Sequence, residues 1–382
     1  DKGDCIASSL LDEYGYAFFM NQTLTVNYEN KPAYDIMFEP DFGKLAEKIC
    51  ALGMEHRRFM IITDHNVEKY YLEEIKNLLA PIAKTVISYT FIAGDSSKNL
   101  ATVNECYEEL ILAGFDRSDV LVALGGGVVG DLTGFTAATY LRGVRFLQIP
   151  TSLLAMVDSS IGGKTGVDYK SYKNMVGAFH QPQLVYMNLT TLLSLGDNEY
   201  YSGMGEIIKH GLIKDSEYYE WLKANTEGIE SKTYSVLNEM IERSCCIKKE
   251  VVEKDPKELG ERALLNFGHT IGHSVEKLMD FKLLHGECVC IGMAAAAFLS
   301  QKRENISLKE YEDILATIKL FHQPIHVPGL SAEAVYEVSR LDKKMDSDKI
   351  KFILLDKIGH SVIDSTVSKE EMMEAILSIL AQ

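Results

Sequence analysis

Two glycine-rich loops in close succession limit what this chain can fold into more than any other feature. The first, Gly125-Gly126-Gly127, directly follows an apolar run at 119–124 that is typical of a buried strand. The second, Gly162-Gly163-Lys164, follows another such run at 144–149 and the turn Pro150-Thr151-Ser152. Glycines at strand ends let a backbone approach a phosphate and offer it N–H groups. The pattern predicts a phosphate-binding edge on a sheet, with two ligand-free tight turns as the alternative.

Strand and helix patterns alternate through the first half of the chain. Strands are predicted over 58–63, 85–92, 119–124 and 144–149, with helices over 67–79 and 99–113. This alternation indicates an α/β domain with a parallel sheet and helices on both faces. Ligands bind such sheets at the carboxyl ends of the strands.

The second half is dominated by helical patterns. Helices are predicted over 199–213, 233–254, 263–277, 286–302, 308–320 and 368–380. We therefore expect an α/β domain over 1–190 and a mainly α-helical domain over 191–382. No flexible linker separates them, so we expect them to pack around a shared cleft.

Composition narrows the class of protein. A net charge of −16 argues against nucleic acid and anionic membranes as partners. No apolar segment reaches the roughly 18 residues of a membrane-spanning helix. Seven cysteines form no Cys-x-x-Cys pair, which favours reduced thiols and a cytoplasmic location.

The first glycine loop contains the pattern Gly-x-Gly-x-x-Gly at 125, 127 and 130. In the standard dinucleotide fingerprint this pattern lies in the first strand–helix unit, with an acid about 20 residues later. Here the loop instead comes well after Asp64, in a later unit, so a variant dinucleotide-binding (Rossmann-like) fold is predicted. Asp64 could accept hydrogen bonds from a ribose, or simply end a strand.

A carboxylate and several histidines form a candidate metal site. His269 and His273 are four residues apart and share a helix face, His285 begins the next helix, and Glu206 lies on an earlier one. One carboxylate and two or three imidazoles from separate helices can make a catalytic zinc-type site with open positions for substrate. His-Glu-x-x-His is absent, which excludes the zincin proteases.

Cations collect in the same segments of this acidic chain. Clustered near a metal, they would bind a carboxylate and a phosphate, with arginine giving bidentate geometry. They are Arg142, Lys164, Lys173, Lys209, Lys248, Arg262, Lys343 and Lys344, and Asn174 and Asn266 add neutral hydrogen-bonding groups.

These residues resemble the 3-dehydroquinate synthase family of the sugar-phosphate cyclase superfamily. The resemblance spans residues 30–380 and rests on seven motifs in order: GGGVVGDLTGF, RGVRFLQIPTSLLAMVDSSIGGKTGVD, KNMVGAFHQP, GEIIKHG, RALLNFGHTIGHSVE, LHGE and LDKK.

The resemblance implies that the domain over 1–190 binds NAD and that the domain over 191–382 binds the substrate and a divalent metal, zinc or cobalt. It also implies the site residue by residue. The implied metal ligands are Glu206, His269 and His285. The implied NAD contacts are Asp64, Gly94, Asp95, Lys98, Gly127, Val128, Val129, Gly130, Asp131, Thr151, Ser152, Lys164, Lys173, Thr191, Leu192, Leu193 and Ser194. The implied substrate and catalytic contacts are Asp158, Lys164, Asn174, Lys209, Lys248, Arg262, Asn266, His273, Lys344 or its neighbour Lys343, and Arg142. In the family, the residue matching Arg142 reaches the neighbouring subunit's site, which implies a homodimer.

Two positions depart from the family pattern. Asp95 stands where the family has glutamate in its cofactor loop, which predicts a longer or water-mediated hydrogen bond to the cofactor. Asn188 replaces the usual acid before the second domain.

The implied activity belongs to the shikimate pathway of aromatic amino acid biosynthesis. It converts 3-deoxy-D-arabino-heptulosonate 7-phosphate into 3-dehydroquinate and phosphate by transient NAD oxidation, phosphate elimination, re-reduction and aldol closure. The alternatives are another sugar-phosphate cyclase, such as a 2-deoxy-scyllo-inosose or sedoheptulose 7-phosphate enzyme, a glycerol-dehydrogenase-type polyol oxidoreductase, or an inactive scaffold. The inosose synthases carry glutamate where Asn266 stands here, which favours the first activity.

Overall fold

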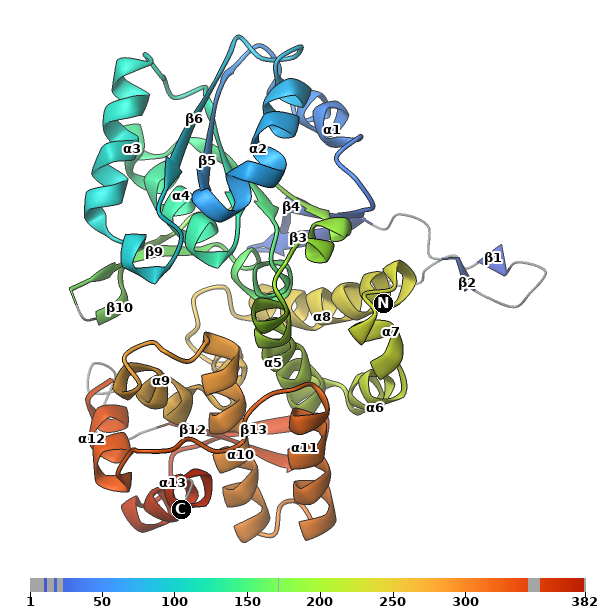
Figure 1. The fold of residues 1–382 in the computed structure, drawn as a ribbon, viewed down its shortest axis with the longest axis vertical. Coiled ribbons are helices and arrows are strands. Elements are labelled where there is room, and N and C mark those ends of the chain that lie inside the picture. Colours follow the sequence, from blue (N-terminus) through green and yellow to red (C-terminus); the bar gives the residue numbers. More distant parts are fainter. Residues whose placement is uncertain (1–9, 12–16, 19–22, 171, 343–350, 381–382) are drawn as a thin grey trace.

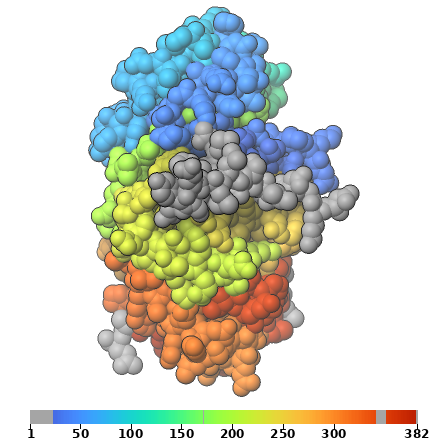
Figure 2. Space-filling view, turned by 90° about the vertical axis from the view of Figure 1, so that its right-hand side faces the viewer, coloured from blue at the N-terminus to red at the C-terminus, as the bar shows by residue number. Residues whose placement is uncertain are grey.

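The computed structural model describes residues 10–11, 17–18, 23–170, 172–342 and 351–380. Within these residues, an α/β half lies above a mainly helical half (Figure 1). Figure 2 shows the same stacking from the side, with the α/β half in blue and the last helices in orange and red. No described helix is both long and apolar enough to cross a membrane.

The α/β half is built on one seven-stranded sheet. Its strands are β3 (Thr23–Tyr28), β4 (Lys31–Glu39), β5 (Arg58–Asp64), β6 (Thr85–Phe91), β7 (Val120–Gly125), β8 (Arg145–Pro150) and β11 (Leu184–Asn188). They lie in the order β3-β4-β11-β8-β7-β5-β6, and every pair is parallel except β3–β4. This order differs from the standard dinucleotide-binding sheet, as predicted.

The strand order creates a binding edge between β5 and β7. From β5 the chain adds β6 on one side, then returns to add β7 and β8 on the other. Ligands bind open sheets at such a reversal, beyond the carboxyl ends of the strands. Asp64 and Gly125 end these two strands, so the sheet brings the predicted acid and the glycine loop to one edge.

Helices cover both faces of the sheet. They are α1 (Leu45–Ala51) and α2 (His65–Leu79) on one face, and α3 (Leu100–Leu112) and α4 (Gly127–Thr139) on the other. The sequence of β5 is apolar throughout because both faces of this strand are buried. Phe59 and Ile61 pack into the core on one face of the sheet, and Met60 and Ile62 into the core on the other. The remaining strands here are β1 (Leu10–Leu11), β2 (Ala17–Phe18) and the hairpin β9 (Lys164–Tyr169) and β10 (Tyr172–Phe179).

The helical half confirms the predicted pattern and adds a hairpin that was not predicted. Its helices are α5 (Asp197–Lys214), α6 (Ser216–Ala224), α7 (Thr226–Glu230), α8 (Tyr234–Lys254), α9 (His269–Leu278), α10 (His285–Lys302), α11 (Leu308–Leu320), α12 (Ala332–Asp342) and α13 (Lys369–Ile379). The hairpin pairs β12 (Phe352–Lys357) with β13 (His360–Asp364). One core joins β4 and β11 to α5 and α8, so the two halves share buried apolar surface.

The helix predicted over 263–277 is wrong at its start. Residues Glu261–Asn266 form a 3-10 turn, and α9 begins only at His269. Gly268 causes the break, because its φ of 80° lies in the left-handed region. A Cβ there would also lie 2.7 Å from the carbonyl oxygen of Val289.

Candidate active site

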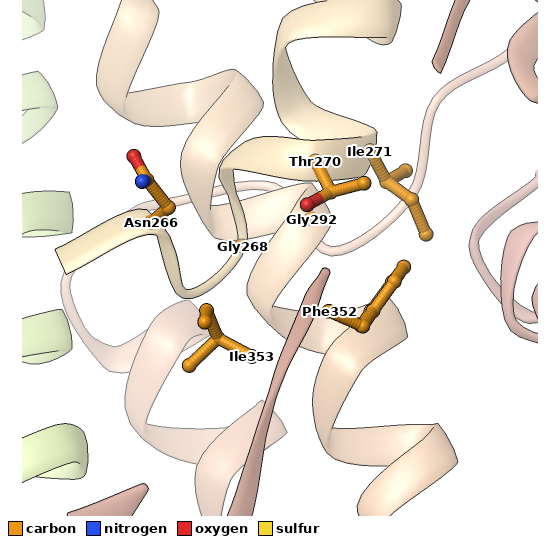
Figure 3. A pocket seen from close by; sticks show the side chains of 7 residues that line it. All are labelled: Asn266, Gly268, Thr270, Ile271, Gly292, Phe352 and Ile353. Carbon is orange, nitrogen blue, oxygen red and sulfur yellow. The ribbon is translucent and has the colours of Figure 1, made fainter. Parts of the chain in front are cut away.

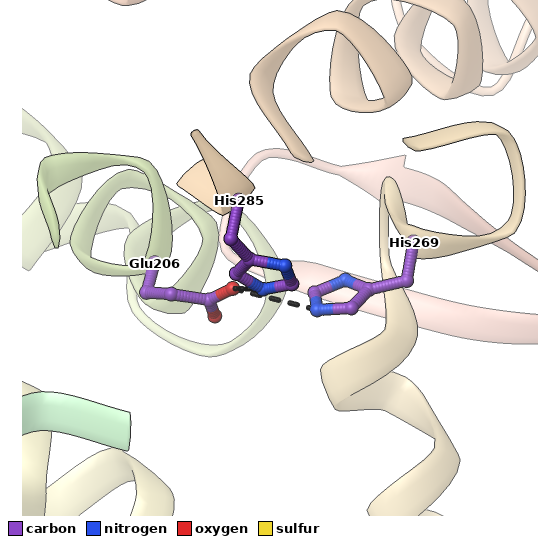
Figure 4. Close-up of side chains that lie close together, drawn as sticks. All are labelled: Glu206, His269 and His285. Atoms are coloured by element: carbon purple, nitrogen blue, oxygen red, sulfur yellow. Dashed lines mark ion pairs between the residues drawn. The ribbon is translucent and has the colours of Figure 1, made fainter. Parts of the chain in front are cut away.

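Three side chains from three helices converge on one point. Glu206 extends from the middle of α5, His269 from the start of α9 and His285 from the start of α10 (Figure 4). Nε2 of each histidine lies 3.4 Å from Oε1 of Glu206. His273 joins the cluster, with its ring 5.1 Å from that of His269 and 5.8 Å from that of His285. The structure thus brings together the three predicted metal ligands.

Glycines bring these helices close enough to converge. A Cβ on Gly286 would lie 1.8 Å from the carbonyl oxygen of Ser202 on α5. A Cβ on Gly292 would lie 1.8 Å from the carbonyl oxygen of Gly268, just before α9. Because any other residue would push these backbones apart, the glycines keep α10 in direct contact with both neighbours.

The donors of this cluster suit a divalent cation. Glu206 is fully buried, and among the described residues its oxygens make ion-pair contacts with Lys209, His269 and His285 but no well-aligned hydrogen bond. Burial alone would raise its pKa, but Lys209 and His269 hold the pKa well below its ordinary value, so the carboxylate is ionised. His269 Nδ1 lies 3.1 Å from the carbonyl oxygen of Phe267, which directs Nε2 at Glu206. One carboxylate and two imidazoles form a typical catalytic zinc-type ligand set.

His285 lies between two carboxylates. Its Nε2 faces Glu206, and its Nδ1 lies 3.7 Å from Oε2 of Glu276. Burial opposes protonation, but the contacts with Glu206 and Glu276 raise the pKa of His285 to about 10. The two carboxylates therefore favour a positive charge at this position, which a bound cation would supply.

A second buried group adjoins the triad. Lys248 on α8 is 5% exposed, and its Nζ lies 2.5 Å from Oδ1 of Asp158 in the π-helical turn Ala155–Ser159. Burial would raise the pKa of Asp158, but Lys248 lowers it to about 2. Lys209 contacts Glu206 in the same way. The partly exposed Asp158 and the buried Glu206 thus each have a lysine partner, which keeps both carboxylates charged at neutral pH.

Three of the predicted anion-binding residues, Lys164, Arg262 and Asn266, lie close together, and Glu258, which was not predicted, is their shared neighbour. Arg262 is buried and donates to the carbonyl oxygens of Gly162, at 3.3 and 3.4 Å, and Pro256, at 2.7 Å. Asn266 donates to Oε1 of Glu258 at 3.0 Å, and Lys164 pairs with Oε2 of the same carboxylate. The only sequence signal for Glu258 is its place between Asp255 and Gly260 in a turn just before Arg262.

The cofactor edge has the features of a phosphate site. Gly126 caps α4 without a side chain, so no side chain occupies the first N–H groups of this helix. Asp64 caps α2, with its Oδ1 accepting from the N–H groups of Asn66, at 2.8 Å, and Val67, at 3.1 Å. Beside them, Lys98 Nζ lies 2.6 Å from both Asp131 Oδ2 and Asn174 Oδ1.

One lysine connects the two halves across this edge. Lys173 on β10 lies 2.5 Å from Oδ2 of Asp95, in the loop after β6. Its Nζ also lies 3.3 Å from Oε1 of Glu276 on α9. The predicted cofactor loop and the metal cluster are therefore joined by a single cation.

Other predicted residues stand apart from these contacts. Arg142 is exposed, and no side-chain contact joins it to the site within the described residues. Thr191 Oγ1 donates to the Asn188 carbonyl at 2.8 Å, and the Ser194 hydroxyl lies 2.5 Å from that of Tyr71. Lys343 and Lys344 lie outside the described residues. Asn188, the second departure, caps the following turn by accepting from the Thr190 N–H at 3.0 Å.

A small crevice lies between the start of α9, α10 and β12 (Figure 3). It is lined by Asn266, Gly268, Thr270, Ile271, Gly292, Phe352 and Ile353. It has no room for a sugar phosphate, so it belongs to the packing between α10 and β12 rather than to the site.

Comparison with known proteins gives one consistent result. Family models described as 3-dehydroquinate synthase N-terminal and C-terminal match residues 88–202 and 203–345. The 3-dehydroquinate synthase of Acetivibrio thermocellus is 41% identical over 359 residues, which are 94% of this chain and 99% of that protein. Among solved structures, 2-epi-5-epi-valiolone synthase from Streptomyces hygroscopicus, with NAD+ and Zn2+ bound, matches with a TM-score of 0.85 and 27% identity, over 93% of this chain and 99% of that one. A 2-deoxy-scyllo-inosose synthase complexed with carbaglucose-6-phosphate, NAD+ and Co2+ matches at 0.85 and 23% identity, over 94% and 100%, and supports the fold alone.

Proposed function

The chain belongs to the 3-dehydroquinate synthase family, and from that premise we propose that it converts 3-deoxy-D-arabino-heptulosonate 7-phosphate into 3-dehydroquinate and phosphate, with NAD recycled in each turnover. The observation that carries the proposal is the buried Glu206, whose Oε1 lies 3.4 Å from the Nε2 atoms of His269 and His285. The cations described above, Lys164, Lys209, Lys248 and Arg262, belong to the same site. A carboxylated sugar phosphate needs both features in one site.

Glu206, His269 and His285 would hold the metal. The ion, zinc or cobalt, supplies Lewis-acid polarisation of the substrate's hydroxyl and carbonyl oxygens when it is bound. His273 lies beside these ligands and Lys209 contacts Glu206, so both can polarise a hydroxyl or relay a proton. The relatives with Zn2+ and Co2+ in their structures support this choice of metals.

The phosphate and carboxylate of the substrate would meet different cations. Lys164, Arg262, Asn266, Asn174 and Lys344 would hold the phosphate, and Lys248, next to Asp158, would hold the carboxylate side. Glu258 pairs with Lys164 in the absence of substrate, and the substrate phosphate would take the place of this carboxylate. These residues would then accelerate the reaction mainly by orienting the substrate and by stabilising the charge that develops in the transition state.

NAD would lie across the carboxyl ends of β5 and β7. When bound, NAD would supply reversible hydride transfer, and the ketone formed on the substrate would acidify the neighbouring C–H for loss of phosphate. Asp64 has one oxygen committed to capping α2 and a second that can accept from a ribose hydroxyl. The uncapped N-terminus of α4 would face the pyrophosphate, with Thr151 and Ser152 beside it.

Two further features belong to the proposal. The exposed Arg142 would act in the site of a second copy of the chain, which makes the working unit a homodimer. The reduced cysteines and the biosynthetic role of the relatives support a cytoplasmic location.

A panel of substrates separates this activity from its rivals. The purified protein, with NAD and zinc, is given 3-deoxy-D-arabino-heptulosonate 7-phosphate, sedoheptulose 7-phosphate, a hexose 6-phosphate and glycerol in separate reactions. We expect phosphate release from the first alone. Release from the hexose phosphate alone would assign an inosose synthase, and net NADH from glycerol would assign a polyol dehydrogenase.

A further inference from the structure

We propose that Glu276 is a positioning residue of the metal site, which orients the ligand His285 and links it through Lys173 to the cofactor loop. The inference rests on the proposed metal ligands Glu206, His269 and His285. It concerns a carboxylate that ends the motif RALLNFGHTIGHSVE, but to which neither the predicted site nor the mechanism above gives a role.

Glu276 belongs to the face of α9 that forms the site. His269, His273 and Glu276 are spaced at i, i+4 and i+7, so their side chains lie in one row along the helix. Glu276 is only 6% exposed. A glutamate buried this deeply needs charged partners, and its partners here are His285 and Lys173.

Both metal-ligand histidines have the same arrangement of nitrogens. His269 directs Nδ1 at the Phe267 carbonyl and Nε2 at Glu206. His285 directs Nδ1 at Glu276, 3.7 Å away, and Nε2 at Glu206, 3.4 Å away. A partner on the second nitrogen fixes the ring and raises its basicity, and removing such a partner commonly costs about 10- to 100-fold in metal affinity. The separation at Glu276 is that of an ionic contact, so its charge matters more than its shape.

Lys173 extends this arrangement to the cofactor loop. Its Nζ lies 3.3 Å from Glu276 Oε1 and 2.5 Å from Asp95 Oδ2, and 4.3 Å from the ring centre of Phe281. Asp95 belongs to the α/β half and Glu276 to the helical half. NAD bound against Asp95 would therefore also restrict the positions of Lys173, Glu276 and His285. Since linkage is reciprocal, metal binding and NAD binding should strengthen each other.

A different role for Glu276 is possible on the same geometry. His273, Glu276 and His285 have ligand atoms close enough to hold an ion by themselves. In that arrangement Glu276 would be a ligand, and its loss would abolish binding instead of weakening it.

Zinc affinity of the metal-free protein tests the proposal without any substrate. The chelator-stripped protein is titrated with zinc against a fluorescent chelator as wild type, Glu276→Gln, Glu276→Asp and Glu39→Gln. Glu39 is a matched control, because it is 2% exposed and pairs with Lys44 in the α/β half. We expect about a 10- to 100-fold loss for Glu276→Gln, a smaller loss for Glu276→Asp, and no change for Glu39→Gln. Far-ultraviolet circular dichroism confirms that each variant is folded.

Cobalt adds a readout that a purely structural role would not move. The visible absorption bands of the cobalt-loaded protein should shift in Glu276→Gln and return toward wild type in Glu276→Asp. Wild-type affinity and bands in Glu276→Gln would overturn the proposal, and complete loss of binding would make Glu276 a ligand. If wild type itself bound no zinc, the proposed metal site would fail first.

NAD affinity tests the link through Lys173. Zinc should tighten NAD binding to the wild-type protein by at least about fivefold, and this ratio should fall toward one in Glu276→Gln. An unchanged ratio would contradict the link even if the zinc titration succeeds.

Discussion

At the scale of single residues, the site depends on charges that are buried in opposite pairs. Glu206 and Lys209 are 0% and 1% exposed at their side chains and contact each other one helical turn apart on α5. Leaving one member of such a pair alone commonly costs about 3–5 kcal/mol, because the remaining charge has no solvent around it. Glu206 therefore has to balance both Lys209 and the bound metal ion.

Glu206→Gln should abolish metal retention. The amide cannot balance Lys209 together with a divalent cation, so zinc measured by elemental analysis after dialysis should fall to background. Glu206→Asp keeps the charge on a shorter side chain and should fold normally while binding zinc more weakly. Full zinc content in a folded Glu206→Gln protein would contradict the proposed ligand set.

Arg262→Lys should weaken binding of the sugar phosphate without affecting NAD. Lysine keeps the charge but cannot donate to Gly162 and Pro256 while also reaching a phosphate, as the guanidinium fork can. We expect KM for the substrate to rise at least about tenfold, in line with the ~1.5–3 kcal/mol of a charged hydrogen bond. The NAD dissociation constant is the control, and an unchanged KM would rule out this role.

The sequence predicted the metal ligands but not their carboxylate neighbours. His269 and His285 stand out because histidines are rare in this chain, and the family motifs mark both of them and Glu206. Glu258 lies outside the quoted motifs, and Glu276 ends one of them without a predicted role, so nothing in the sequence shows that either carboxylate lies against cations. Only the packing of loops and helices reveals such partners.

At the scale of elements, glycines set the spacing of the helices that carry the ligands. Gly286 brings α10 against α5, and Gly292 brings it against the backbone before α9. The three ligand-bearing helices therefore form a rigid unit, and a shift of any one would move a metal ligand.

Gly292→Ala should separate α10 from the segment before α9. Its methyl group would lie 1.8 Å from the carbonyl oxygen of Gly268, so the backbones must move. We expect a loss of about 1–3 kcal/mol or more from overpacking, together with weaker zinc binding. Ala296→Gly in the same helix is the control, with a loss of about 1 kcal/mol and unchanged zinc affinity. Wild-type zinc affinity in Gly292→Ala would show that this spacing is not needed.

Arg303 ties α10 to α13 and β13 far from the site. Its guanidinium donates to both oxygens of Glu371 at 2.8 Å and to Asp364 at 2.7 Å. Arg303→Ala removes these hydrogen bonds and should lower the free energy of unfolding. Because the guanidinium is partly exposed, we expect the loss to be only about 1–2 kcal/mol. Lys302→Ala, which removes an exposed pair with Glu374, should change it by no more than about 0.5 kcal/mol.

The effect of Arg303→Ala should depend on pH. The hydrogen bond from Arg303 lowers the pKa of Glu371 from its ordinary value of 4.5 to about 2. A carboxylate with a depressed pKa stabilises the fold fully above the unfolded value and loses that effect as pH falls through the folded value. The difference between wild type and variant should therefore be constant above pH 4.5 and shrink toward pH 2, as measured by denaturant unfolding. A constant difference across this range would contradict the pairing.

Periodicity predicted the central strands of the sheet and most of the longer helices, and it missed shorter elements and local breaks. The predicted strands and helices agree with the observed ranges within two residues, apart from the segment at 263–277. The elements that were not predicted include β3, β4, α4, β9, β10, β11, α6, α7 and α12. That segment breaks because Gly268 adopts a left-handed conformation next to α10, which is a tertiary requirement. The hairpin β12–β13 was missed because its short apolar run gives no helical or clear alternating period.

At the scale of the whole molecule, function arises where the two halves meet. The sheet brings the glycine loop and Asp64 to one edge, and α5 and α8 carry the shared core from β4 and β11 toward the metal cluster. The sequence indicated an α/β half and a helical half. The strand order and the contact of Lys173 with both halves could not be predicted, since they depend on long-range pairing.

The most direct test follows phosphate and NADH in the same reaction. The protein is mixed with 3-deoxy-D-arabino-heptulosonate 7-phosphate, catalytic NAD and zinc, and phosphate release is measured alongside absorbance at 340 nm. Release of one phosphate per substrate, without accumulation of NADH, is the predicted result, because the hydride is returned in each turnover. Net NADH in proportion to substrate, or no phosphate from a protein loaded with metal and NAD, would contradict the proposed cyclase.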